Sequence, residues 1–283
     1  MSEPLLPYLL DIVTAPEAKE LILAGGLGLR LKQAFRKASG HRSLISAYPE
    51  SRATQDMDFF LLLSMFIEPA KGIAFRHFLV REGYAPAEGA KHFHFVKRVD
   101  RGVLGTMEVK VDLLARQPLV DESVKVNGPR VGSGIDLHGR VTPEAFSLEE
   151  EPLRIPIVGS KSDGTATKEA SVLVPHAFTW LNLKIQAAHD WLKNNKPGGQ
   201  KHVLDVYILT AMLTPEELDQ SARLGIKYQE HPQAQAVRDA CRELFESDDS
   251  PGCVEIIRQG VPVIDGAFFE GLQHALCLVH KSP

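Results

Sequence analysis

The chain has 283 residues, of which 44% are hydrophobic and 24% are charged. These proportions are typical of globular proteins and argue against disorder, collagen-like repeats and coiled-coil rods. The formal net charge of −4 argues against a protein held to nucleic acid by bulk electrostatics, although it allows a local basic site. The sequence shows neither an apolar stretch of about 20 residues nor a basic signal-peptide region, so we expect a cytoplasmic protein with no membrane partner.

Cysteines and histidines, the usual ligands of transition metals, do not predict such a site here. Cys241, Cys253 and Cys277 are widely spaced and include no CxxC pair, so they encode neither a disulfide framework nor a structural zinc site. We expect them to be buried, unreactive thiols. His92 and His94 share one face of a predicted strand, but without a third ligand nearby in the sequence they predict no metal.

The first part of the chain alternates between helical and strand-like patterns, as expected for a mixed α/β domain. The spacing of apolar residues predicts helices over residues 4–19 and 71–82. Short apolar runs predict strands over residues 20–24 and 56–61. A further helix is predicted after the Gly25-Gly26 pair, with an apolar face formed by Leu27, Leu31, Ala34 and Phe35.

The rest of the chain divides into a strand-rich, an irregular and a helical part. Polar and apolar residues alternate over 92–98 and 106–114, which predicts two strands that pair as a hairpin. Residues 115–170 are rich in turn-forming residues and predict irregular structure with short strands at 124–126 and 153–158. Helices are then predicted over 176–195, 200–213, 215–226, 233–247 and 266–280. We therefore predict an α/β domain over residues 1–170 and a helical domain over residues 171–283.

Three aspartates of the predicted α/β domain are the strongest candidates for chemistry. Asp56 and Asp58 are two residues apart on a predicted strand, so their side chains project from the same face. Asp112 lies in an otherwise apolar strand, where an unpaired buried charge would be costly. A hard divalent cation such as Mg²⁺, shared by the three carboxylates, would compensate these charges.

The same residues also allow purely structural roles. Asp56 can pair with the nearby Arg52 at a strand edge, and Asp112 can be a solvated acid at a strand end. The metal site is favoured by the combination of the D-x-D pair with a third strand aspartate and an upstream glycine turn. At Gly25 and Gly26 a strand gives way to a helix, where backbone N–H groups can approach phosphate oxygens. Together these features indicate phosphoryl or nucleotidyl transfer.

Four sequence blocks also carry a resemblance to a known family. They are ILAGGLGLRL, RATQDMDFF, MEVKVDLL, and LNLKIQAAHDW with KHVLDVYIL. In this order they resemble the AbiEii-type nucleotidyltransferases, the toxin half of abortive-infection toxin–antitoxin pairs in the polymerase-β-like superfamily. The resemblance implies an α/β fold of the α+β type, in which a nucleotidyltransferase domain with a mixed sheet precedes a helical domain. It also implies Mg²⁺ or Mn²⁺ as cofactor, a nucleoside triphosphate as substrate and an antitoxin protein as partner.

The resemblance assigns catalytic and metal-binding roles to three residues, Asp56, Asp58 and Asp112. The first two fall on the family's R-x-[ST]-x-D-x-D-F block, and the third falls on the acid of a later strand. Nucleotide-binding roles fall on residues of the glycine turn, of the D-x-D block and of two helical blocks: Gly25, Gly26, Arg52, Thr54, Lys184 and Asp205.

Lys184 and Asp205 come from the two helical blocks. Lys184 and Ala187 fit the family's K-x-x-A helix, and Lys184 would meet the triphosphate. Lys201, Asp205 and Tyr207 fit the family's second helix, a basic residue followed by D-x-Y at fixed spacing. Plainer roles are also open, because a lysine on an apolar helix face often extends its amine to water and Asp205 can be a helix ion-pair partner.

The sequence departs from the family pattern at several positions. Leu27 stands where Ser or Thr would offer a hydroxyl to phosphate. Trp191 stands where an Arg is expected, and His202 where an acid is expected. Residues 38–51 form an insertion, which we expect to lie beside the site.

We therefore expect a metal-dependent nucleotidyltransferase that moves a nucleoside monophosphate from a triphosphate to an acceptor hydroxyl. The sequence does not choose between tRNA, a protein and a small molecule as the acceptor. Two alternatives stay open. One is a non-catalytic protein that keeps the fold and binds a nucleotide or a partner, and the other is a small-molecule nucleotidyltransferase of the antibiotic-modifying kind.

Overall fold

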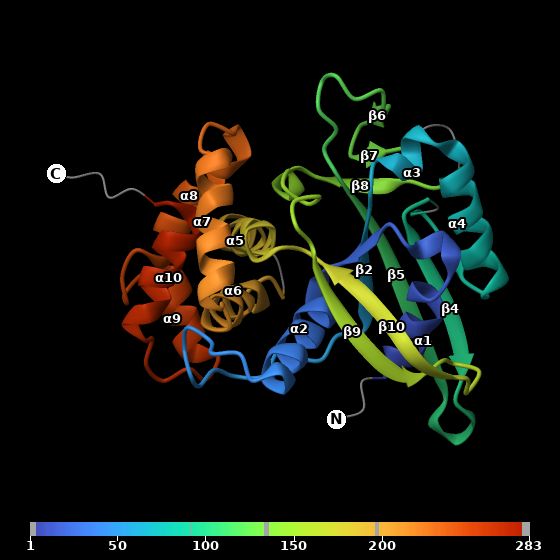
Figure 1. Ribbon diagram of the computed structural model, residues 1–283, viewed down its shortest axis with the longest axis horizontal. Coiled ribbons are helices and arrows are strands. Elements are labelled where there is room, and N and C mark those ends of the chain that lie inside the picture. The colour runs from blue at the N-terminus through green and yellow to red at the C-terminus, as the bar shows by residue number, and fades with distance from the viewer. Residues whose placement is uncertain (1–3, 91, 133–135, 196–197, 279–283) are drawn as a thin grey trace. The chain divides into compact units, whose positions relative to one another are not determined.

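The computed structural model describes residues 4–90, 92–132, 136–195 and 198–278. Over these residues it is a mixed α/β structure with ten α-helices and a ten-stranded sheet (Figure 1). The chain forms two compact units. The first, the α/β unit, comprises residues 1–31, 52–143 and 152–175, and the second, the helical unit, comprises residues 32–51, 144–151 and 176–283.

All the strands belong to the α/β unit. They are β1 (Leu21–Leu23), β2 (Asp56–Leu61), β3 (Ala85–Pro86), β4 (His94–Asp100), β5 (Thr106–Arg116), β6 (Val126–Asn127), β7 (Arg130–Val131), β8 (Gly139–Thr142), β9 (Leu153–Ser160) and β10 (Ala166–Val174). The main path of the sheet runs β6-β7-β8-β5-β2-β1-β10-β9. The pairs β2–β5, β5–β8 and β1–β10 are parallel and the others are antiparallel, so the sheet is mixed.

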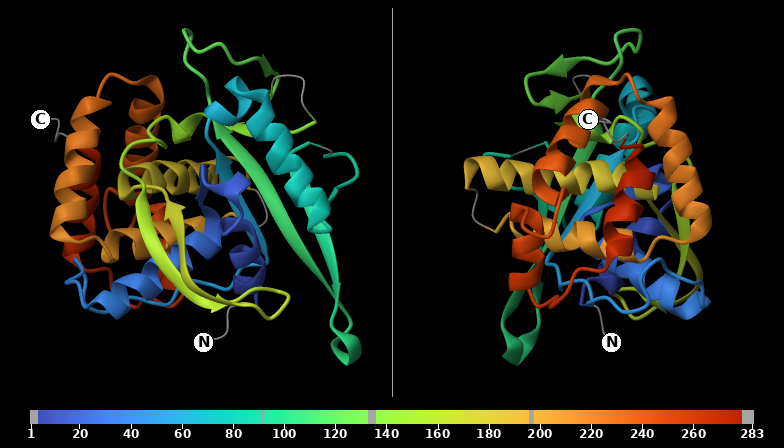
Figure 2. Two further views of the ribbon diagram at one scale, coloured as in Figure 1. Left: turned by 45° about the vertical axis from the view of Figure 1, so that its right-hand side comes forward. Right: turned by 90° about the vertical axis from the view of Figure 1, so that its left-hand side faces the viewer.

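The predicted hairpin is confirmed by β4 and β5, which pair antiparallel from His94 to Thr106 and extend together in both views of Figure 2. By contrast, the expectation of irregular structure up to residue 170 is wrong, because β10 begins at Ala166 and pairs with β9. Along β10, buried Ala170 and Val172 alternate with more exposed residues. This alternation is that of a strand with one covered face. It is not evident in the sequence, because turn-forming and charged residues precede and interrupt the apolar positions.

Four helices occur in the first third of the chain: α1 (Leu6–Val13), α2 (Gly25–Ser39), α3 (Ser64–Ile67) and α4 (Pro69–Arg81). The helix predicted over 4–19 is therefore too long. Its end is explained by Pro16, because a proline disfavours helical backbone in the residue before it, and Ala15 is extended with ψ 137°. A short 3₁₀ turn, Pro16–Ala18, then leads into β1.

The helical unit contains α5 (Ala177–Asn194), α6 (Lys201–Ala211), α7 (Pro215–Lys227), α8 (Pro232–Phe245), α9 (Pro251–Arg258) and α10 (Gly266–Leu276). Side-chain caps fix several starts, such as the capping box in which Thr214 and Glu217 bond each other's backbone N–H groups. No helix in the described part of the chain combines the length and apolar character needed to cross a bilayer.

The apolar face predicted for α2 is partly wrong. Ala34 is exposed, whereas Lys32 and Arg36 are buried. Both cations reach the same carboxylate oxygen of Glu217, Lys32 Nζ at 2.7 Å and Arg36 Nη2 at 3.0 Å. No local pattern indicated this cluster, because its acid lies some 180 residues away on α7. A buried ion pair of this kind replaces part of the apolar packing that the helix pattern suggested.

The segment between α2 and β2 is held by specific contacts. Gln33 accepts the Ser51 N–H at 2.7 Å and donates to the Pro49 carbonyl at 2.8 Å. The Leu44 N–H donates to a carbonyl just beyond α6 at 2.8 Å, and the Ile45 N–H donates to the last carbonyl of α6 at 3.0 Å. Most of the insertion predicted at 38–51 is therefore anchored within the helical unit.

All three cysteines are free, and Cys241 and Cys253 are buried as expected. Burial raises the pKa of each of these two thiols to about 12, so they stay protonated and unreactive at neutral pH. Cys277 is only partly buried and ends α10 with a left-handed backbone, φ +50°.

Candidate active site

The turn between β1 and α2 lies directly against β2. Gly25 has a φ of +63°, and a Cβ atom on it would overlap the Asp58 carboxylate. A Cβ atom on Gly26 would lie 3.1 Å from Thr54 Cβ and 3.6 Å from Arg52 Nη2. Position 25 therefore needs glycine both for its backbone and for lack of space. The first turn of α2 is brought next to the predicted D-x-D block as a result.

Three aspartates share one face of the sheet. Asp56 and Asp58 alternate on β2 with Met57, which faces the opposite side and is fully buried. In the parallel pairing of β2 with β5, Asp58 lies beside Asp112 and Asp56 lies beside Lys110. Neighbouring strands are about 4.8 Å apart, and residues paired in this way project to the same face. The structure thus brings Asp112 next to Asp58, and Asp56 follows one pleat along.

The residues that precede β2 have both local and longer contacts. The Asp56 N–H donates to Thr54 Oγ1 at 3.5 Å, and the Thr54 hydroxyl donates to the Asp56 carbonyl at 3.4 Å. These are long, weak bonds of the type that a threonine forms at a strand entry. The Ala24 N–H donates to the Asp58 carbonyl at 2.8 Å and ties the glycine turn to β2. Arg52, Thr54 and both glycines are consequently gathered at one end of the aspartate face.

His94 is a member of this cluster that the sequence did not assign to it. It is paired with Asp112 across the β4–β5 hairpin, and its Nδ1 contacts Asp112 Oδ1. The side chains are 24% and 32% exposed. His92 lies in the turn before β4, so the expected strand face shared by the two histidines does not form; its ring instead packs 4.6 Å from that of His138, between centroids.

The aspartates provide the oxygen ligands that Mg²⁺ or Mn²⁺ prefers. As the side chains stand, no three His, Cys, Asp or Glu groups in the described residues are close enough together to form a metal centre. The Asp112 carboxylate is engaged by His94, and the Asp58 carboxylate lies against Gly25. The chemistry of the donor set suits a hard divalent cation, although the three carboxylates do not converge on one point as they stand.

The two other predicted nucleotide contacts lie in the helical unit. Lys184 on α5 and Asp205 on α6 form an ion pair of 2.6 Å between Nζ and Oδ2, and only 5% and 1% of the residues are exposed. His202 Nδ1 lies 3.7 Å from the same Oδ2, and burial lowers the pKa of His202. Lys184 does not extend to water, and Asp205 acts as a helix ion-pair partner.

The positions that depart from the family pattern have structural roles. Leu27 is completely buried in the first turn of α2, so it packs and offers nothing to a phosphate. Trp191, on α5, lies against Gly199, where an added Cβ would overlap the indole. Both side chains therefore contribute to packing within their own units.

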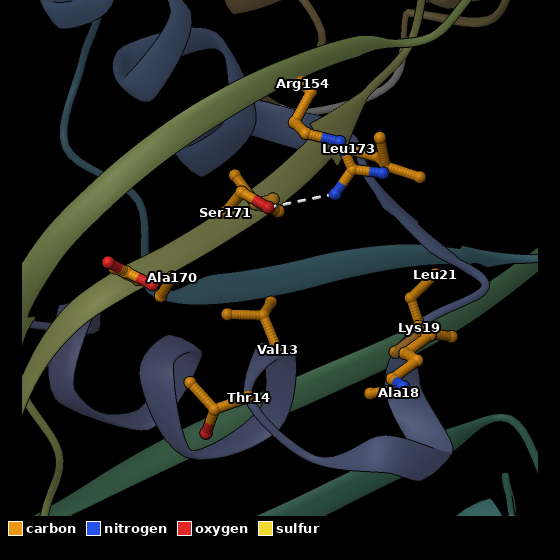
Figure 3. A pocket seen from close by; sticks show the side chains of 11 residues that line it. Val13, Thr14, Ala18, Lys19, Leu21, Arg154, Ala170, Ser171 and Leu173 are labelled. Carbon is orange, nitrogen blue, oxygen red and sulfur yellow. Dashed lines mark hydrogen bonds between the residues drawn. The ribbon is translucent and has the colours of Figure 1, made fainter.

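A separate cavity of about 380 Å³ lies in the α/β unit between α1, the turn Pro16–Ala18, β1 and β10 (Figure 3). Beside it, Arg154 Nη1 donates to Ser171 Oγ at 2.9 Å. None of the predicted site residues lines this cavity. It is therefore distinct from the aspartate face.

Comparison with known proteins does not assign this chain to a group. No protein-family model matches the sequence. No curated protein matches it either. The functional argument consequently depends on the site itself.

Proposed function

We propose that the protein is a metal-dependent nucleotidyltransferase that moves a nucleoside monophosphate from a triphosphate to an acceptor hydroxyl. The observation that supports this most directly is the register of β2 and β5, which sets Asp58 beside Asp112 on the face that also holds Asp56. Neighbouring carboxylates repel each other, so a fold that aligns three of them is best explained by a cation that they share.

In this proposal Asp56, Asp58 and Asp112 would hold Mg²⁺ or Mn²⁺. When bound, such an ion would neutralise charge on the phosphates. The glycine turn supports the same function, because the start of α2 lies directly against the D-x-D block, and a helix N-terminus of this kind favours phosphate oxygens. Arg52, beside Gly26, would add positive charge for the departing pyrophosphate.

The transfer exchanges a phosphoanhydride bond for a phosphoester bond. The acceptor oxygen forms a bond to the α-phosphorus, and the bond from that phosphorus to the pyrophosphate oxygen breaks. Asp112 would take the proton of the acceptor hydroxyl. The toxin role with an antitoxin partner is proposed on the sequence resemblance alone.

The binding of nucleoside triphosphates in the presence of Mg²⁺ tests this proposal. We expect calorimetry to detect binding by the wild-type protein that is lost in the Asp56→Asn/Asp58→Asn double variant. The Asp248→Asn/Asp249→Asn double variant is the matched control, because it makes the same charge change at exposed turn positions. If no triphosphate binds at millimolar concentration, the nucleotidyltransferase proposal is rejected.

Transfer itself is tested by incubation with α-³²P-labelled triphosphates and total RNA. Label in tRNA that disappears in the double variant supports a tRNA acceptor, whereas label in a small molecule supports the antibiotic-modifying kind of enzyme. Metal-dependent binding without any transfer would instead support the non-catalytic alternative. That alternative is favoured by the buried Leu27, which removes a phosphate ligand from the turn.

A further inference from the structure

We propose that His94 is a positioning residue of the aspartate site: it holds one carboxylate oxygen of Asp112 so that the other oxygen faces the cation. This inference depends on the proposed function, since it assigns His94 a role toward the same metal centre. The inference also extends the proposed function, because His94 belongs to a different strand and to none of the sequence blocks that indicated the site.

The backbone explains why His94 and Asp112 meet. The Leu113 N–H donates to the Phe93 carbonyl at 2.8 Å, one residue beyond the His94–Asp112 pair on each strand. This bond makes His94 and Asp112 a non-hydrogen-bonded pair of an antiparallel ladder, in which the Cα atoms are only about 4.5 Å apart and the side chains lie closest. The contact is therefore set by the register of the hairpin.

The same register places three functional side chains in one row across the sheet. Asp58 on β2 is beside Asp112 on β5, and Asp112 is opposite His94 on β4. Asp112 consequently has an anionic neighbour on one side and an imidazole on the other. Repulsion from Asp58 favours a rotation of the Asp112 carboxylate away from the cation site, and the contact with His94 opposes free rotation.

The chemistry of the two groups fixes which one donates. An ionised carboxylate only accepts hydrogen bonds, so the His94 Nδ1–H donates to Asp112 Oδ1. One carboxylate oxygen is then occupied and the second stays available as a ligand. Ligating carboxylates are commonly oriented in this way, and loss of such a partner typically lowers metal affinity about 10- to 100-fold.

The test is Mn²⁺ binding to the whole protein, followed through the EPR signal of the free ion. His94→Asn keeps an N–H donor near the position of Nδ1, whereas His94→Phe keeps a flat ring without a donor. We expect His94→Asn to bind Mn²⁺ within about 3-fold of the wild type and His94→Phe to bind about 10- to 100-fold more weakly. His77→Phe on the exposed side of α4 is the control and should leave affinity unchanged.

A double-variant comparison shows whether His94 acts through Asp112. His94→Phe should weaken binding no further once Asp112→Asn is present. Thermal melting of each variant establishes that it is folded; the partly exposed strand position of His94 tolerates an aromatic ring. Because the readout is ion affinity, it does not depend on finding the acceptor substrate.

Each other outcome overturns the role of His94. Tighter binding by His94→Phe would mean that the imidazole competes with the cation for Asp112, and equal weakening by Phe and Asn would mean that His94 is itself a ligand. Unchanged binding by His94→Phe would mean that it has no role. In all three cases the aspartate centre survives; if instead the wild type binds neither Mn²⁺ nor Mg²⁺ at millimolar concentration, the proposed function fails as well.

Discussion

Charged side chains are organised in opposite ways in the two units. On the aspartate face of the α/β unit, Asp58 and Asp112 lie side by side and are partly open to solvent. In the helical unit, Glu217 is buried between Lys32 and Arg36. One arrangement sets like charges next to each other, and the other surrounds a single anion with two cations.

The difference indicates what each arrangement is for. Buried charges persist only when they are paired, because an unpaired ion loses its hydration without compensation. The cluster around Glu217 meets that condition and needs no ligand. On the aspartate face His94 contacts Asp112, yet Asp58 and Asp112 still set two acids side by side at a partly open surface, an arrangement that suits an external cation. The Lys184–Asp205 ion pair resembles the cluster around Glu217, because it is buried and its two charges compensate each other.

The largest expected effect comes from removing the anion of the buried cluster. Glu217→Ala leaves Lys32 and Arg36 buried without a carboxylate and should lower the free energy of unfolding by about 3–5 kcal/mol. Denaturant unfolding followed by circular dichroism measures this. Glu216→Ala, at the exposed neighbouring position, is the control. A loss below about 1 kcal/mol for Glu217→Ala would show that the cluster contributes little and would remove the contrast between the units.

A second effect, of intermediate size, concerns the glycine turn. Gly25→Ala meets both a positive φ and the Asp58 carboxylate, whereas Gly40→Ala meets a similar φ of +67° with open space around it. We expect about 1 kcal/mol of destabilisation for Gly40→Ala and about 2–3 kcal/mol for Gly25→Ala. In an Asp58→Ala background, the additional destabilisation of Gly25→Ala over Gly40→Ala should largely disappear. If the two substitutions lowered the free energy of unfolding equally in the wild-type background, this would contradict the close approach of the turn to β2.

The aspartate face itself should tolerate neutralisation. Asp58 is only partly buried, so Asp58→Asn should change the free energy of unfolding by no more than about 1 kcal/mol, in contrast to Glu217→Ala. Thermal melting without added cations makes the comparison. If Asp58→Asn destabilises the protein as strongly as Glu217→Ala, Asp58 is a structural residue and the argument for a cation loses its basis.

The smallest effect is the pH dependence that His176 gives to the helical unit. Burial lowers the pKa of His176 below the usual 6.5, and its Nδ1 accepts the Phe178 N–H at 3.1 Å as the cap of α5. The unfolded chain then binds the proton more readily than the folded one. The stabilisation is therefore complete above pH 6.5 and is lost as the pH falls through that value toward the lowered pKa.

His176→Asn isolates this contribution, because the asparagine oxygen can cap the helix without titrating. We expect the wild type to lose more stability than the variant between about pH 7.5 and pH 5, as measured by urea unfolding at each pH. The titration of Glu217 does not affect this comparison of stabilities. Burial alone would raise its pKa, but Lys32 and Arg36 outweigh burial and hold it below 4.5, so its loss begins only under more acidic conditions. Parallel pH profiles for the two proteins would contradict the prediction for His176.

Particular residues show which features of the site could be predicted from the sequence. Alternation predicted both strands of the β4–β5 hairpin, and the D-x-D spacing predicted a shared face for Asp56 and Asp58. His94 was missed because its role depends on register. If the predicted strands 92–98 and 106–114 paired directly on either side of the connection 99–105, His92 would lie opposite Asp112. In the structure the pairing is shifted by two residues, and His94 lies opposite Asp112.

The sequence by itself determined local features of this protein: the strands of the β4–β5 hairpin, most of the helices, the place of a glycine turn, and which acids lie two residues apart. Only the tertiary structure decided which distant residues meet, such as Asp58 with Asp112, and Lys32 and Arg36 with Glu217. The physical reason is the range of the interactions. Periodicity and turn chemistry act over a few residues, whereas strand register and the burial of charge depend on contacts between segments that only the folded chain brings together.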